Sequence, residues 1–150
     1  MSEQENIQIV RRTFEYFNNH KPDSVDQYLA DNVRVEAAGA QGTMNKDQNR
    51  MYNHRFFDAA PDLHFDVGDI IAQGDRVAAT WVVHGTHKAP LALPDGGSIP
   101  ATNRTFSVPG CTVAEFRNNL VIHQQVYWDQ VSFLTQLGVI NPQEMMQRAR

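Results

Sequence analysis

The chain has 150 residues, of which 41% are hydrophobic and 20% charged, as in one ordinary globular domain. Its formal net charge of -4 and the lack of a basic stripe argue against nucleic acid or an anionic membrane as a partner. The single cysteine, Cys111, excludes an internal disulfide framework and a cysteine-based zinc cluster. The N-terminus lacks an apolar leader and no segment is apolar enough to span a membrane. We therefore expect one cytoplasmic domain over residues 1–150.

The first sixty residues predict mainly helices. Apolar residues recur at spacings of three and four in the first of these segments, as on the buried side of an amphipathic helix. We predict a helix at about 6–19 and a short helix that begins at about residue 22. A half-buried strand at 33–35 and another helix at about 46–59 follow. Tyr52 and Phe56 are four residues apart on the last of these helices, so we expect them to be buried together.

From Leu63 onward, β-branched and aromatic residues occur in runs that are separated by turn signals. We expect hairpin turns at Gly74 and at Asn118-Asn119, because glycine and asparagine tolerate positive φ values. The predicted strands cover about 63–72, 75–88, 103–116 and 120–129. The predicted final helix covers about 129–137. Helices followed by antiparallel strands indicate an α+β fold with the helices on one face of the sheet.

Strand alternation predicts which polar residues face the interior. A turn at Asn118-Asn119 and unbroken alternation place a set of residues on the same side as the apolar Phe116: Val121, His123, Gln125, Tyr127 and Asp129. The same parity on the predicted strand at 75–88 brings Trp81 and His87 to that side. A carboxylate there is desolvated, which raises its pKa and suits proton transfer.

Each of these residues also has a simpler interpretation. Asp129 starts a helix and is a favoured N-cap residue, and His87 fits a solvated loop edge. His123 and Gln125 fit polar groups at the edge of the core, while Trp81 and Tyr127 fit plain core packing. His84 and His87 are three apart in a strand and so point to opposite faces, which argues against zinc between them.

Several segments resemble a known family in the same order along the chain. They are FDAAPDLH at 57–64, IAQGDRV at 71–77, GTH at 85–87, IPATNR at 99–104, YWD at 127–129 and QLG at 136–138. In these segments the chain resembles the SnoaL-like polyketide cyclases of the nuclear transport factor two-like superfamily. The resemblance implies a cone-shaped α+β fold, with N-terminal helices on a curved, mostly antiparallel sheet and a short C-terminal helix.

The resemblance also implies an enzyme that closes a ring by intramolecular aldol condensation, without metal or cofactor. Asp129 then acts as general acid and base and His87 assists it, on a small hydrophobic carbonyl compound. The residues expected to bind the substrate are Tyr52, Phe56, Trp81, His123, Gln125 and Tyr127.

Other functions remain open on the sequence. The same fold hosts non-catalytic binding modules, ketosteroid-isomerase-like enzymes and epoxide-hydrolase-like enzymes, and fold does not decide among them. We also expect a homodimer or higher homo-oligomer, because alternation places Val82, Val126 and Trp128 on the outer face of the sheet.

Overall fold

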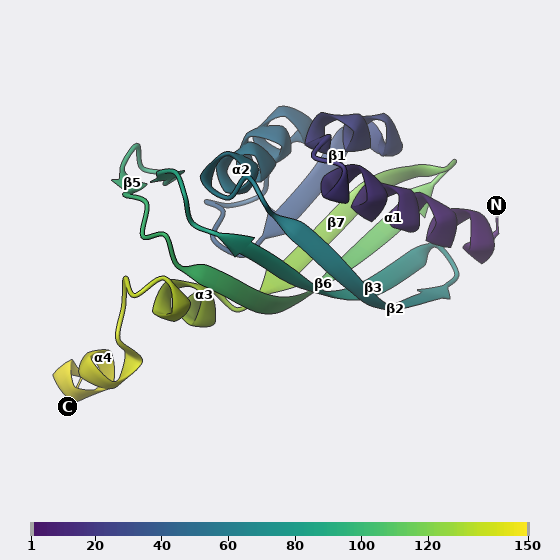
Figure 1. Ribbon diagram of the computed structural model, residues 1–150. Helices are drawn as coiled ribbons and strands as arrows, with labels where there is room; N and C mark the ends of the chain where they lie inside the picture. Colours follow the sequence, from purple (N-terminus) through teal and green to yellow (C-terminus); the bar gives the residue numbers. More distant parts are fainter. Residues whose placement is uncertain (1, 150) are drawn as a thin grey trace.

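The computed structural model describes residues 2–149 and shows helices packed on one face of a curved sheet (Figure 1). The elements are α1 (Glu3–Asn18), the 3-10 helix η1 (Pro22–Tyr28), β1 (Leu29–Ala37), α2 (Lys46–Ala59), β2 (His64–Gln73), β3 (Arg76–Thr86), β4 (Leu91–Ala92), β5 (Ser98–Ile99), β6 (Thr105–Arg117), β7 (Leu120–Trp128), α3 (Gln130–Gln136) and α4 (Pro142–Arg148). The predicted α+β class is confirmed. Strands β4 and β5 and helix α4 were not predicted.

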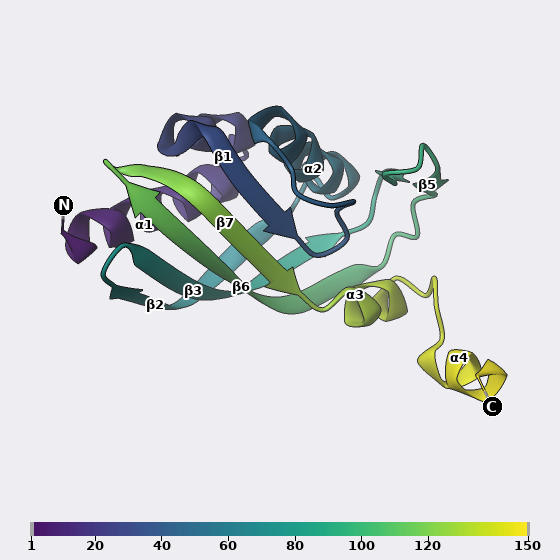
Figure 2. The same cartoon turned by 180° about the vertical axis from the view of Figure 1, so that it is seen from behind.

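The five long strands form one sheet in the order β1-β7-β6-β3-β2. The first pair, β1 with β7, is parallel, and the other three pairs are antiparallel. Figure 2 shows β1 beside β7 from behind, with β2 at the opposite edge. Helices α1 and α2 lie on one side of the sheet (Figure 1), and side chains from both layers pack together in one core.

Local sequence signals set the ends of the elements. Ser2 and Glu5 form a capping box that satisfies backbone N–H groups at the start of α1. The hairpin between β6 and β7 turns at Asn118 and Asn119, which both have positive φ. Within residues 2–149, no helix is both long and apolar enough to cross a membrane.

Buried side chains form two groups. The larger group joins α1 and α2 to the sheet and includes Phe14, Val35 and Phe116. The smaller group lies where α3 meets the sheet and includes Val108 and Phe133. Burial of these apolar groups is the main favourable contribution to folding, at about 25 cal/mol per Å².

A β-bulge interrupts strand β7 just after its hairpin. Phe116 pairs with Val121, but Glu115 pairs with His123 instead of Ile122, so Ile122 is an extra residue. The alternation therefore restarts one position later. From Gln124 onward, the even-numbered residues of β7 face the helices, which reverses the assignment made from unbroken alternation.

Candidate functional site

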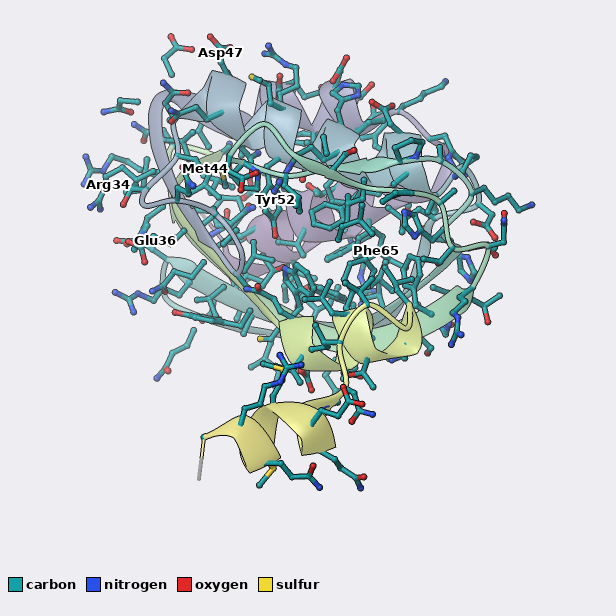
Figure 3. All side chains as sticks on the ribbon, turned by 90° about the vertical axis from the view of Figure 1, so that its left-hand side faces the viewer. Arg34, Glu36, Met44, Asp47, Tyr52 and Phe65 are labelled. Atoms are coloured by element: carbon teal, nitrogen blue, oxygen red, sulfur yellow. The ribbon has the colours of Figure 1, made fainter. Side chains whose placement is uncertain are left out.

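A cavity of about 120 Å³ lies between the helices and the concave face of the sheet. In Figure 3, Tyr52 and Phe65 lie in the space between the two layers, whereas Arg34 and Glu36 point away from it. Much of the wall is aromatic, and these side chains are Phe14, Phe17, Tyr28, Tyr52, Phe56, Phe57, Phe65, Trp81, Phe106, Phe116, Trp128 and Phe133. The volume is below the roughly 300 Å³ of pockets for drug-sized ligands and close to the roughly 150 Å³ of a cavity that holds benzene. It therefore suits a ligand of about one ring.

The polar groups on this wall are neutral. Among the lining residues in the described part of the chain, none is Asp, Glu, Lys, Arg or His. Three lining residues carry side-chain amides: Asn49, Asn53 and Gln124. Within residues 2–149 these amides form no hydrogen bond with another protein group, although Asn49 is only 3% exposed. Buried polar groups are normally paired, so these amides are available to a ligand or to water.

The phenol of Tyr52 is fully engaged in hydrogen bonds. Its hydroxyl donates to the carbonyl oxygen of Ala38 at 2.8 Å and accepts from Nε1 of Trp128 at 2.8 Å. Burial raises the pKa of Tyr52 to about 12, although the Trp128 hydrogen bond acts in the opposite direction. Tyr52 is therefore protonated at neutral pH and holds the wall together rather than acting as a base.

The aromatic residues predicted to bind substrate lie on the cavity wall. Phe56 meets Tyr52 and Trp128 edge to face, at centroid distances of 5.2 and 5.6 Å. Trp81 donates from Nε1 to Oγ1 of Thr112 at 3.0 Å, which orients its ring against the sheet. The structure thus brings Tyr52, Phe56 and Trp81 together, and their role in binding a substrate stays a prediction.

The polar residues of β7 that were expected to face the cavity point the other way. His123 and Gln125 contact Glu36 of β1, at Nε2 to Oε1 and Nε2 to Oε2 distances of 3.2 and 3.4 Å. Tyr127 is 54% exposed. The predicted placement of His123, Gln125 and Tyr127 is wrong because the bulge at Ile122 shifts the alternation by one residue.

The same shift corrects the predicted outer face. Val126 and Trp128 line the cavity instead of the solvent side of the sheet. Of the three residues on which the expectation of a homo-oligomer was based, only Val82 is not on the cavity wall.

Asp129 is exposed and caps helix α3. Its Oδ1 accepts a hydrogen bond from the backbone N–H of Ser132 at 2.9 Å. It does not belong to the residues that line the cavity. Its predicted place on the cavity wall is wrong for the same reason of parity, and the helix-cap interpretation describes the observed contact.

His87 is buried at 2% exposure but does not line the cavity. Strand β3 ends at Thr86, so strand alternation no longer governs the direction of the His87 side chain. Its Nδ1 lies 3.0 Å from Oγ1 of Thr102 and accepts from the backbone N–H of Thr102 at 3.3 Å. Within residues 2–149, the Nε2 of His87 has no hydrogen-bond partner. Neither the predicted position in the pocket nor the solvated loop edge is correct.

The model of one protein family, SnoaL-like polyketide cyclase, matches residues 7–137. The chain belongs to the SnoaL-like polyketide cyclase family. The match covers both the helices and the sheet that enclose the cavity. A search among curated proteins finds no match to this SnoaL-like chain.

Solved structures share the fold at low sequence identity. AclR of Streptomyces galilaeus, a proposed hydroxylase, is 17% identical with a TM-score of 0.81, and the alignment covers 93% of this chain and 100% of AclR. A proposed SnoaL-like polyketide cyclase from Jannaschia sp. CCS1 is 18% identical with a TM-score of 0.80, over 93% and 95% of the two chains. A Catenulispora acidiphila protein with a ketosteroid isomerase-like fold, in complex with trimethylamine, is 20% identical with a TM-score of 0.71, over 88% and 93%. This SnoaL-like chain therefore has the ketosteroid isomerase-like fold.

Sequence reasoning missed the amides on the cavity wall of this SnoaL-like chain. Gln124, Asn49 and Asn53 are absent from the residues expected to line the cavity, and unbroken alternation is incompatible with an inward Gln124. The spacing of Asn49, Tyr52, Asn53 and Phe56, at three and four residues, is the one signal that places both asparagines on the buried face of α2. No sequence signal marked the bulge that turns Gln124 inward.

Proposed function

We propose that this SnoaL-like chain binds a small, neutral carbonyl compound in the cavity and promotes ring closure within it. The observation that carries the proposal is an aromatic wall with three uncommitted amides and no charged side chain among its described residues. Aromatic rings provide apolar contact area, and a few placed polar groups orient the ligand. Membership of the family supports ring closure as the reaction.

The wall contributes to ring closure in two ways. It restricts a flexible ligand to folded conformers in which the reacting carbons are close, which removes part of the entropic barrier. The N–H groups of Asn49 and Gln124 can donate to carbonyl oxygens and stabilise the negative charge that develops on an enolate. The enolate carbon then attacks the second carbonyl, and the resulting alkoxide takes up a proton.

The proposed general acid and base for the two proton transfers is Asp129, as the family resemblance implies. Its carboxylate caps α3 and lies outside the described wall of the cavity. The role therefore requires the carboxylate to leave the Ser132 amide and turn toward the ligand. Asparagine caps a helix about as well as aspartate, so Asp129→Asn keeps the cap and removes the base.

Binding is tested by fluorescence, because both tryptophans of the chain, Trp81 and Trp128, line the cavity. We expect benzoylacetone, a single-ring diketone, and toluene both to change the emission. Replacing Gln124 by Leu weakens benzoylacetone binding about 5-fold, corresponding to the loss of about one hydrogen bond, and leaves toluene binding unchanged. The matched control is Gln125→Leu on the outer face. Failure of both ligands to bind, or equal effects of the two variants, contradicts the proposed site.

Catalysis is tested on a linear diketone whose carbonyls are separated by three carbons, because its aldol closure gives one six-membered ring. We expect formation of the cyclic β-hydroxy ketone to fall about 100-fold in Asp129→Asn, while fluorescence shows unchanged binding. Equal rates in the variant and the unchanged protein contradict the role of Asp129.

A second candidate function is a non-catalytic binding module. The observation that favours it is that no carboxylate or imidazole belongs to the described cavity wall. It predicts ligand binding by fluorescence without turnover of any diketone, and no effect of Asp129→Asn on either measurement. Turnover above the uncatalysed rate rules this candidate out.

A further inference from the structure

Three potential metal ligands lie together on the outer face of the β2–β3 hairpin, away from the cavity. His64 and His84 are directly opposite each other in the antiparallel ladder. Asp66 is two residues from His64 and therefore lies on the same face. Phe65, between them, faces the cavity instead. Sequence separation hides this group, because the hairpin register alone brings His84 to the other two residues.

The side chains of this group are already close. Nε2 of His84 lies 2.8 Å from Oδ2 of Asp66. The His64 and His84 rings are stacked, with centroids 4.9 Å apart and planes 19° from parallel. One ligand atom from each of the three residues lies within 4.8 Å of the other two. Ligand atoms on one tetrahedral zinc are about 3.3 Å apart, so small side-chain rotations bring the three into coordination distance. His64 and Asp66 are exposed and His84 is partly so, which leaves room for these rotations.

The backbone that carries two of these residues is held from the other side. Asn18 of α1 donates from Nδ2 to the Phe65 carbonyl at 2.9 Å and accepts from the Phe65 N–H at 2.7 Å. This pair of bonds pins the edge strand between His64 and Asp66. The rigid backbone reduces the entropy lost when their side chains are ordered by a ligand.

Hydrogen bonding also orients one imidazole. Nδ1 of His64 lies 3.2 Å from the carbonyl oxygen of Asp62, which can only accept, so Nδ1 carries the proton and Nε2 keeps its lone pair. A backbone carbonyl that accepts from the other ring nitrogen is a usual partner of a metal-bound histidine. Within the described residues, Asp66 forms an ion pair with His84, and no Lys or Arg pairs with its carboxylate.

We propose that His64, His84 and Asp66 form a binding site for a zinc-like divalent transition metal. Two imidazole nitrogens and one carboxylate oxygen are the donors that such ions prefer, and three protein ligands leave at least one position for water. Asp66 brings negative charge to a group that otherwise offers two neutral nitrogens. The site is independent of the cavity and of the function proposed for it, because it lies on the opposite face of the sheet.

The test is calorimetric titration of the full chain with Zn²⁺ alone. We expect one ion per chain with micromolar affinity, and at least about 10-fold weaker binding in His64→Gln and in His84→Gln. The matched control is His54→Gln, which removes another partly exposed histidine that contacts an aspartate, Asp23, at 2.7 Å. The control is expected to bind zinc like the unchanged protein. The proposal is overturned if no binding is detected at about 100 μM zinc, which is roughly 100 times the expected dissociation constant. It is also overturned if all variants bind zinc with equal affinity.

Thermal unfolding distinguishes a variant that has lost zinc binding from a variant that has lost its fold. Binding to the native state alone raises Tm with zinc concentration. Each variant is therefore melted with and without zinc, and its circular dichroism in the absence of zinc shows whether it folds. We expect zinc to raise the Tm of the unchanged protein and of His54→Gln, but not that of folded His84→Gln. A zinc-dependent rise in folded His84→Gln that matches the unchanged protein overturns the proposal.

Discussion

The two faces of strand β7 differ sharply in character. One face presents Gln124, Val126 and Trp128 to the cavity. The other presents His123 and Gln125 to Glu36, and Tyr127 to solvent. The two sets alternate along one strand, so one inserted residue decides which set lines the cavity. The chemistry of this cavity therefore depends on the backbone register and not on which polar residues the strand contains.

The largest expected difference between the two faces is in stability. Trp128→Ala removes an indole that packs against Phe56 and Phe133 and donates to Tyr52. We expect it to lower the free energy of unfolding by about 3 kcal/mol. Tyr127→Ala on the outer face is expected to change it by less than about 0.5 kcal/mol. Urea denaturation checks both, and equal losses contradict the assignment of the two faces.

The second expected effect is a dependence of stability on pH that comes from the cavity side. Tyr52 has a pKa near 12 in the folded state and near 10 when unfolded. Between these values the unfolded chain binds fewer protons than the folded chain, so stability falls as pH rises and is unaffected by Tyr52 below about pH 9. The free energy of unfolding falls by about 3 kcal/mol in total, because each unit of pKa difference corresponds to about 1.4 kcal/mol.

Urea denaturation at pH values from 8 to about 12 measures this loss, with Tyr52→Phe as the control. The variant is less stable throughout, because Trp128 and Ala38 lose their hydrogen-bond partner. Its decline between pH 8 and about 12 is expected to be about 2 kcal/mol smaller than that of the unchanged protein, because Tyr52 is still half protonated in the folded state at pH 12. Parallel curves for the two proteins contradict the assignment to Tyr52.

A smaller effect is expected from removing the bulge itself. Deletion of Ile122 lets His123 pair with Glu115 directly after Phe116 pairs with Val121, so the inward set stays inward. We expect a folded protein that loses less than about 2 kcal/mol and keeps the emission maximum of its two cavity tryptophans. A red-shifted emission in the native state contradicts the proposed role of the bulge.

The smallest expected effect is at the end of the strand, where Asp129 caps α3. Asp129→Ala is expected to lower the free energy of unfolding by about 1 kcal/mol, and Asp129→Asn by much less, because Asn restores the bond to Ser132. Thermal or urea denaturation compares the two variants. Equal destabilisation by Ala and Asn contradicts the capping role.

The order of helices and strands could be predicted because each depends on local signals. Apolar spacing marked α1 and α2, and Asn118-Asn119 marked the β6–β7 hairpin. The same α2 spacing placed Tyr52 and Phe56 together on the buried face. The resemblance in six segments indicated the family, which the match over residues 7–137 confirms.

The polar part of the cavity could not be predicted, because it depends on non-local geometry. A bulge adds one residue on a strand without changing its composition or hydropathy, so nothing in the β7 sequence marks Ile122 as the extra residue. His87 lies beyond the end of β3, where the contacts of the 100–104 segment, not alternation, direct its side chain.

Periodicity, turn residues and recurring segments were therefore enough to predict the fold class, the family and the aromatic content of the interior. The tertiary structure alone decided that Gln124 and Trp128 face the cavity, that Asp129 caps a helix, and that His64 and His84 meet across a hairpin. The physical reason is that side-chain direction in a strand has a period of two. A single residue of register then exchanges inside and outside, and pairing between distant segments sets that register.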